Sequence, residues 1–142
     1  MNETNLRSGA LAKLTGVSTD TLRHYERLGL LAKPPRTSAG YRLYPPSTVD
    51  RVKLIRRAMS VGFSLDELTR ILKNRDRGGA PCKHVRQLAA DKLASLEQQI
   101  VDMQILRDQM CAMLQDWDTR LARTPDGHKA LLLESLLEER TK

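Results

Sequence analysis

The sequence predicts a mainly α-helical protein with a winged helix-turn-helix head, connecting helices and a long C-terminal helix that forms a coiled-coil dimer. Three observations in the 142 residues predict this fold. Short apolar stripes of helical spacing, separated by glycines, occupy the first half, and a proline-rich stretch interrupts them at residues 32–46. The stretch from Cys82 to the residue before Pro125 contains neither glycine nor proline, which is typical of one long helix.

The first two helices are predicted from their apolar spacing and their end signals. A short helix that starts near Ser8 stops at Gly16, and Ser18 can cap a second helix that ends at Gly29. Such a pair is either a helix-turn-helix or a helical hairpin that packs on itself. The polar face of the second helix favours the DNA-reading motif, because it carries side chains of the types that contact phosphates and base edges: Thr19, Thr21, Arg23, His24 and Arg27.

Residues 32–46 predict a β-hairpin wing. Prolines and Gly40 exclude a helix here, while the segment Tyr41 to Tyr44 alternates as a short strand does. Arg36 and Arg42 flank the turn, so a wing that lies along DNA would present two cations to phosphates.

Two connecting helices follow the wing. Ser47 is expected to cap the first, which ends at Gly62 and carries Arg56 and Arg57 on its polar face. Residues 64–67 form a capping box at the start of the second, and residues 75–81 break the helical pattern.

The long helix has an apolar seam of alternating four- and three-residue steps, which is the heptad pattern of a coiled coil. A small head cannot cover such a seam, so a second copy is the expected partner, with the segment 131–137 of the same chain as the alternative. The expected interface residues are Leu93, Leu96, Ile100, Met103, Met110, Leu114 and Trp117.

Charge is divided unequally between the two halves. Residues 1–80 hold 15 basic and 7 acidic side chains, whereas residues 81–142 hold 9 and 10. A basic head on a near-neutral tail is typical of a nucleic-acid-binding protein. A coiled-coil adaptor would leave that basic head unexplained, the head lacks the aromatic strands on which RNA bases stack, and no catalytic motif indicates an enzyme. No apolar run predicts a membrane span or a secretory signal, so we expect a cytoplasmic protein.

The motifs resemble those of the MerR family of bacterial transcription regulators over residues 6 to about 120. They are Val17 to Leu31, Gly40 to Tyr44 and Gly62 to Leu68. The resemblance implies an antiparallel coiled coil in a homodimer, which binds a palindrome inside a promoter. It also implies that an inducer makes the dimer distort this double-stranded DNA, so that RNA polymerase can engage both promoter elements.

The resemblance also assigns roles to residues of the head. It implies that the recognition helix, the wing and the first connecting helix contact DNA, although Tyr25 and Tyr44 can instead be packing residues. The residues that this resemblance assigns are Thr21, Arg23, His24, Tyr25, Arg42, Tyr44, Arg56 and Arg57.

The inducer is left open by the sequence. Cys82 matches a ligand position of the metal-sensing branch, but residues 119–129 lack the two cysteines that the resemblance leads us to expect in that loop, and Trp117 stands where one would be. A mixed site of Cys82, Cys111 and His128 is one candidate for a metal ion. A thiol redox switch, an organic ligand beside Trp117 and no ligand at all are the alternatives.

These signals divide the chain into four expected parts. Residues 1–77 form the DNA-binding head with its connecting helices, and residues 78–81 form a linker. Residues 82–120 form the dimerisation helix, and residues 121–142 form an effector loop with a short helix.

Overall fold

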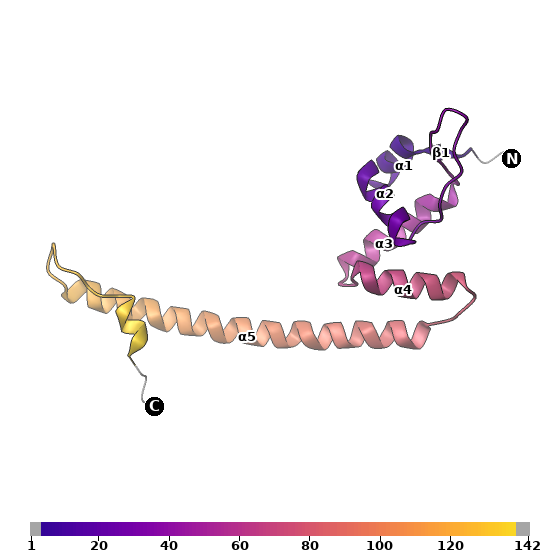
Figure 1. Ribbon diagram of the computed structural model, residues 1–142. Helices are drawn as coiled ribbons and strands as arrows, with labels where there is room; N and C mark the ends of the chain where they lie inside the picture. The colour runs from indigo at the N-terminus through magenta and orange to yellow at the C-terminus, as the bar shows by residue number, and fades with distance from the viewer. Residues whose placement is uncertain (1–3, 139–142) are drawn as a thin grey trace. The chain divides into compact units, whose positions relative to one another are not determined.

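A computed structural model describes residues 4–138 of the chain (Figure 1). Contacts divide it into two compact units, of which the first extends to Lys92 and the second begins at Leu93. The order of elements is β1 (Leu6–Arg7), α1 (Ser8–Thr15), α2 (Thr19–Leu28), β2 (Leu43–Tyr44), α3 (Ser47–Ser60), α4 (Leu65–Asp76), α5 (Cys82–Arg123) and the 3-10 helix η1 (Glu134–Leu137).

The helix-turn-helix forms where the sequence predicts it. The Ser18 hydroxyl accepts a hydrogen bond from the backbone N–H of Thr21 at 3.0 Å and so caps α2. Gly16 and Gly29 close α1 and α2 with φ angles of 73° and 80°, which a residue with a Cβ adopts only under strain. The two glycines therefore fix the turn between the helices and the exit from the second.

The small sheet pairs segments that are far apart in the sequence. Strand β1 runs antiparallel to β2, with Leu6 opposite Tyr44 and Arg7 opposite Leu43. Within the wing itself, Arg36 and Arg42 form an isolated bridge, and the backbone N–H of Thr37 bonds the carbonyl of Tyr41 at 2.8 Å. The wing is thus anchored to the chain ahead of α1, a pairing that the sequence did not predict.

The two connecting helices begin and end close to the predicted residues. Pro46, rather than Ser47, occupies the N-cap of α3, and Ser47 is its first helical residue. The capping box of α4 is confirmed: Ser64 accepts from the N–H of Glu67 at 3.1 Å, and Glu67 accepts from the N–H of Ser64 at 2.8 Å.

Arg51 joins three parts of the head. Its Nε donates to the carbonyl oxygen of Leu30 at 2.9 Å, just after α2. Its two terminal nitrogens donate to the carboxylate of Asp76, at the end of α4, at 2.9 and 3.2 Å. A bidentate guanidinium–carboxylate pair fixes orientation as well as distance, so Arg51 holds α2 and α4 against α3.

One hydrophobic core lies among α1, α2, the wing and the connecting helices. Its buried side chains come from α1, α2, the loop after α2, β2, α3 and α4, so the fold buries them without help from another chain. The buried residues of this cluster are Leu11, Leu22, Tyr25, Leu30, Leu31, Tyr44, Val52, Ile55, Leu68 and Leu72.

The first turns of α5 belong to the head, although the sequence predicts a boundary at residues 78–81. Lys92 donates to the carboxylate of Glu67 at 2.7 Å and lies over the ring of Phe63 at 5.9 Å from its centre. The pKa of Glu67 is lowered to about 2, mainly by the hydrogen bond from Lys92 and then by the backbone N–H of Ser64. The carboxylate that caps α4 therefore also holds the third turn of α5.

Helix α5 runs for 42 residues and ends at Arg123, just ahead of Pro125. None of its residues is buried. Beyond it the chain turns back, and the indole N–H of Trp117 donates to the hydroxyl of Ser135 at 3.0 Å. The segment after α5 therefore packs on the end of the same helix. Within residues 4–138 no helix is both long enough and apolar enough to cross a membrane.

Candidate nucleic-acid interface

The exposed face of α2 carries the residues expected to read DNA. Arg23 and His24 are exposed, while Thr19 and Thr21 are half-buried. Arg23 lies 3.4 Å from Asp20 one turn earlier, but both side chains are more than half exposed, and such surface pairs contribute little free energy. The guanidinium of Arg23 is therefore available to a base edge or a phosphate.

Glu26 ties the wing to the recognition helix. Its Oε2 accepts from Nε of Arg42 at 3.0 Å and from the hydroxyl of Tyr44 at 3.4 Å. The side chains of Arg42 and Glu26 are only 22% and 11% exposed, so this pair is stronger than a typical surface ion pair. The terminal nitrogens of Arg42 have no hydrogen-bond partner among the described residues, so they can donate to a phosphate while Nε stays on Glu26.

Tyr25 and Tyr44 are core residues of the head, which agrees with the packing role given above as their alternative. Tyr44 is 1% exposed and Tyr25 is 5% exposed. The Tyr25 hydroxyl lies 3.9 Å from the sulfur of Met59. Burial raises the pKa of both hydroxyls, and the carboxylate of Glu26 raises the pKa of Tyr44 further. Both side chains therefore stay neutral and their rings pack in the core, while a contact of either hydroxyl with a phosphate stays a prediction.

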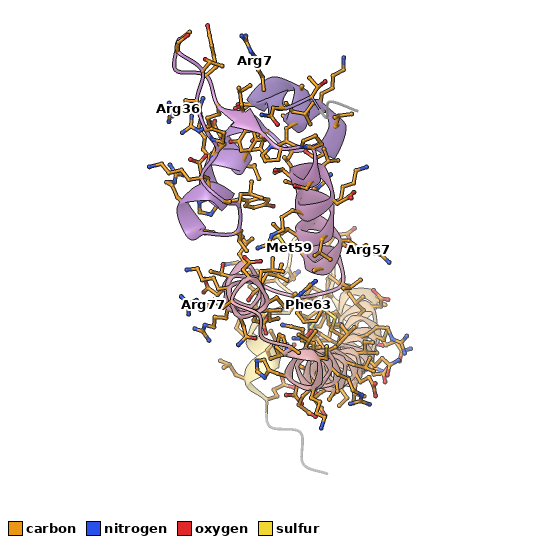
Figure 2. The ribbon with its side chains drawn as sticks, turned by 90° about the vertical axis from the view of Figure 1, so that its right-hand side faces the viewer. Arg7, Arg36, Arg57, Met59, Phe63 and Arg77 are labelled. Carbon is orange, nitrogen blue, oxygen red and sulfur yellow. The ribbon has the colours of Figure 1, made fainter. Side chains whose placement is uncertain are left out.

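The tip of the wing carries a second pair of cations. Arg36 is exposed and donates to the carbonyl oxygen of Gly40 at 3.1 Å, which braces the turn. Arg7, in β1, lies over the ring of Tyr41 at 4.5 Å, within the range of a cation–π contact. Figure 2 shows Arg7 and Arg36 at the same end of the head. No pattern in the sequence identifies Arg7 as a wing residue, because only the pairing of β1 with β2 brings it to the wing.

The two arginines expected on α3 differ in what they do. Nη1 of Arg56 donates to the carbonyl oxygen of Thr15 at 2.6 Å, so Arg56 caps the end of α1. Arg57 is exposed, near the C-terminal end of α3, and its only described hydrogen bond is a long one of 3.4 Å to Ser60 (Figure 2). Of the two, Arg57 is the cation that is free for DNA.

The expected dimer residues of α5 are exposed in the single chain. Trp117 is half-buried beneath the C-terminal segment, and the other six members of the seam are about half exposed or more. A row of this kind leaves a large apolar surface in water, which monomeric proteins avoid. The exposed members are Leu93, Leu96, Ile100, Met103, Met110 and Leu114.

The end of α5 and the segment after it enclose an open groove of about 590 Å³. Met110, Met113 and Trp117 form its apolar wall, and Leu136 faces them from η1. At its rim Arg120 pairs with Asp116 of the same helix at 2.8 Å and with Glu138 at 2.7 Å, and the second of these ion pairs joins the segment to the helix. Residues 131–137 were the alternative partner expected for the seam of α5, and at this end of the helix they do pack against it.

The thiols and the histidine expected to bind metal do not meet within one chain. Cys82 and Cys111 are both exposed and lie 29 residues apart on the same helix, and His128 is exposed in the loop after it. Among residues 4–138 no three His, Cys, Asp or Glu side chains gather closely enough to hold a metal ion. The described part of a single chain therefore holds no cluster of three such donors.

Two family models match the chain. The model described as MerR HTH family regulatory protein matches residues 6–75, and the model described as MerR, DNA binding matches residues 49–113. Together they cover the head, the connecting helices and most of α5.

Individual relatives extend the similarity to nearly the whole chain. The mercuric resistance operon regulatory protein of Bacillus cereus is 35% identical over 133 residues, which are 94% of this chain and 98% of that protein. The HTH-type transcriptional regulator ZntR of Escherichia coli strain K12 is 34% identical over 71% of this chain and 72% of its own. The crystal structure of the transcription regulator PbrR691 from Ralstonia metallidurans CH34 in complex with lead(II) superposes with a TM-score of 0.71 at 28% identity, covering 92% of this chain and 98% of that chain.

Proposed function

Because the chain belongs to the MerR family of DNA-binding transcription regulators and is therefore not an enzyme, we propose that it binds a palindromic promoter operator as a homodimer and distorts that DNA when an inducer binds. RNA polymerase then engages the realigned promoter. Because a regulator of this kind binds promoter DNA, the proposal includes a cytoplasmic location, where the bacterial chromosome lies.

The observation that carries the proposal is the pairing of a free reading face with an anchored wing. Arg23 and His24 project from α2, while Glu26, on the same helix, holds Arg42 of the wing. Recognition helix and wing therefore approach a duplex as one rigid body, which positions base contacts and phosphate contacts together. Arg36 and Arg57 add exposed cations to the same head.

Distortion of the operator needs two such heads. Bending or untwisting a short duplex costs on the order of 1–10 kcal/mol, which firm phosphate contacts on both half-sites can supply. A seam of exposed apolar residues along α5 supports the pairing of two chains. Closed two-fold dimers match the symmetry of a palindrome, so each head reads one half-site.

Operator binding and its salt dependence test this function. Gel-shift titrations on a palindromic duplex at low and moderate salt should show affinity falling steeply as salt rises. Arg23→Ala should weaken binding by about 5- to 150-fold and relax base preference, whereas Arg57→Ala should weaken binding to all sequences alike and lower the salt slope by about one. Lys129→Ala, an exposed cation in the loop after α5, is the matched control and should change neither.

The alternative outcomes are equally clear. Preference for single strands, or no shift on any duplex, would rule out the regulator. An Arg23→Ala protein with unchanged preference among operator variants would show that α2 is not the reading helix.

A metal ion bound through Cys82 is a second candidate property, because relatives carry names that refer to mercury resistance and heavy metals. Cys82 is the first residue of α5 and its thiol is exposed, so it is open to a ligand. Since residues 4–138 of one chain do not assemble a site, the proposal takes the remaining donors from the partner subunit. Soft ions prefer two or three thiolates, whereas zinc accepts mixed sets of cysteine and histidine.

Metal titration of the reduced protein tests this property separately from DNA binding. Hg(II) and Zn(II) should each be added while absorbance is followed in the thiolate charge-transfer region, and the titration repeated on Cys82→Ser. A signal that disappears in the variant supports the site. An identical signal without Cys82 rejects it, and operator binding by the metal-free protein would still stand.

A further inference from the structure

A second groove lies within the head, where α3, α4 and the start of α5 meet. Its volume is about 620 Å³, and every residue that lines it precedes Lys92, so the groove belongs to the first compact unit. It is therefore different from the groove beside Trp117, which is lined by residues of the second unit. Sites that bind small organic molecules are concave, mostly apolar and about 300–1,000 Å³ in volume. The groove in the head has the size of such a site.

Part of the lining is the core of the head itself. Leu68 and Leu72 of α4 line the groove and are only 5% and 2% exposed, and Phe63 packs against the same core. Leu54, and Val61 at the C-terminal end of α3, also line the groove and are 44% and 56% exposed. An apolar ligand body in the groove would therefore rest on a packed base and cover side chains that the single chain leaves in water.

Three arginines line the same groove, each from a different helix. Arg57 belongs to α3, Arg75 to α4 and Arg86 to α5. All three are exposed, and none has an ion-pair partner among residues 4–138. The lining contains neither aspartate nor glutamate, so no acidic side chain of the groove balances the three positive charges. Charges of one sign around a concave apolar surface attract a ligand of the opposite sign.

We propose that this groove binds a free, small organic anion with an apolar body, such as a medium-chain carboxylate. The apolar body lies against Leu54, Val61 and Phe63, and the anionic group lies at the arginines. Guanidinium groups suit a carboxylate because their N–H donors form two parallel hydrogen bonds to its two oxygens. This site adds a ligand to the regulator proposed above, but its existence does not depend on operator binding.

The charge of the groove selects an anion over other occupants. A cation of the same shape would be repelled by Arg57, Arg75 and Arg86. A neutral molecule would displace water from these guanidinium groups without giving them a partner, which costs free energy. A bilayer with anionic lipids offers the right charge, but its flat surface does not enter a concave groove between three helices.

The position of the groove predicts what the ligand does to the fold. Arg75 is in the last turn of α4, and Arg86 is in the second turn of α5, so an anionic group that contacts both joins the two helices. Lys92 and Glu67 already form an ion pair between the same two helices. A bound anion adds to this contact, and the amide hydrogens of residues 82–92 should exchange more slowly when the ligand is present.

Isothermal titration calorimetry on the full chain tests the site with a matched pair of probes. Decanoate and decyltrimethylammonium have tails of the same length and opposite charge, and both are used below the concentrations at which they form micelles. Decanoate should bind at one molecule per chain, at least about tenfold more tightly than decyltrimethylammonium. Phosphatidylglycerol vesicles are the third probe and should not retain the protein when they are sedimented.

Two variants remove a charge from the groove, and a third blocks its apolar part. Arg75→Gln and Arg86→Gln should each weaken decanoate binding about five- to tenfold, because each removes one cation from the anionic group. Val61→Glu should abolish binding, because its carboxylate takes the place of the ligand at an exposed position that tolerates the change. Arg70→Gln is the matched control, because Arg70 is exposed on α4 but does not line the groove, and it should bind decanoate normally.

Equal binding of the two decyl probes, or unchanged decanoate binding in both arginine variants, would overturn the site. Binding to vesicles without binding to decanoate would assign the groove to a membrane instead. Decanoate binding that appears only in dilute protein, where a dimer dissociates, would show that a second copy covers the groove. Trp117 is the only tryptophan and lines the other groove, so quenching of its fluorescence by decanoate would place the ligand there.

Gel shifts separate this site from the proposed regulator. Arg75→Gln and Arg86→Gln should bind the operator as the natural protein does, because neither residue is among the proposed DNA contacts. Loss of decanoate binding with intact operator binding is the expected result for both variants. A natural protein that binds the operator but not decanoate would overturn the ligand site alone, and one that binds decanoate but no duplex would overturn the regulator alone.

Discussion

The head and the long helix treat their apolar side chains in opposite ways. In the head, ten of them form one buried cluster, with residues such as Leu22 and Ile55 fully enclosed. Along α5 no residue is buried, although its seam is as regular as any stripe in the head. The difference shows that the head buries its core within one chain, whereas α5 leaves its seam exposed, and on the proposed dimer the stability of α5 depends on a partner.

The largest expected effect on the free energy of unfolding comes from truncating a side chain in the core of the head. Leu22→Ala removes a fully buried side chain of α2 and should lower the free energy of unfolding by about 2–5 kcal/mol. Urea unfolding followed by circular dichroism should show the same loss at low and high protein concentration. Leu96→Ala is the matched change on α5, where the side chain is 53% exposed in the single chain, and its penalty should depend on protein concentration. Equal, concentration-independent losses in both variants would contradict the division into a self-sufficient head and a partner-dependent helix.

A smaller loss of unfolding free energy is expected when the contacts of Arg51 with Leu30 and Asp76 are removed. Arg51→Ala removes the bonds to Asp76 and to the carbonyl oxygen of Leu30, and should cost about 1–3 kcal/mol of unfolding free energy. Asp76→Asn leaves the bond to Leu30 in place and should cost less. The urea midpoint of both variants checks the order. Equal losses would mean that the bond from Arg51 to Leu30 contributes nothing.

The stability that the ion pair between Glu67 and Lys92 contributes should decrease at acid pH. The pKa of Glu67 is about 2 in the folded chain against an ordinary value of 4.5, so its ionised form stabilises the fold. This contribution is complete above about pH 5, and it is lost as pH falls through 4.5 toward 2, where the folded chain is also protonated. Glu67→Gln keeps an oxygen for the capping box but loses the ion pair with Lys92, at a cost of about 1 kcal/mol at neutral pH. Unfolding measured from pH 7 to pH 2 should show the two proteins converging, and a constant gap would contradict the assignment.

The smallest effect is expected where the chain covers the end of α5 by itself. Trp117→Phe removes the hydrogen bond to Ser135 and should weaken the packing of the C-terminal segment by about 0.5–1.5 kcal/mol. Faster hydrogen exchange in residues 131–137, with the head unchanged, is the expected readout. Ser135→Ala should have a similar effect, and combining the two changes should add little. Additive losses would mean that the two side chains act separately.

Local signals in the sequence predicted much of the head. The Ser18 cap, the capping box of α4 and the glycines that close the first two helices depend on residues within one turn of each other, so pattern alone identifies them. The pairing of β1 with β2 could not be predicted in this way, because two residues carry no periodicity and their partners lie far along the chain.

The candidate site was predicted less completely than the fold. The prediction that Arg23 and His24 lie on an exposed face is confirmed, because both side chains are polar and lie opposite the apolar stripe of α2. Tyr44 has a polar tip and an apolar ring, and only the packed structure shows that Glu26 binds the tip while the core covers the ring. Long-range contacts of this kind also separate the structural Arg56 from the free Arg57.

The separation of a self-sufficient head from a partner-dependent helix has a genetic consequence. On the proposed pairing, the residues that form the dimer all lie in α5. A chain therefore dimerises whether or not its head can bind DNA. A chain with an intact α5 but an inactive recognition helix would enter mixed dimers and deprive normal chains of their second head. Alleles that damage Arg23 should therefore be dominant over the normal gene, whereas alleles that unfold the chain or disrupt the seam should be recessive.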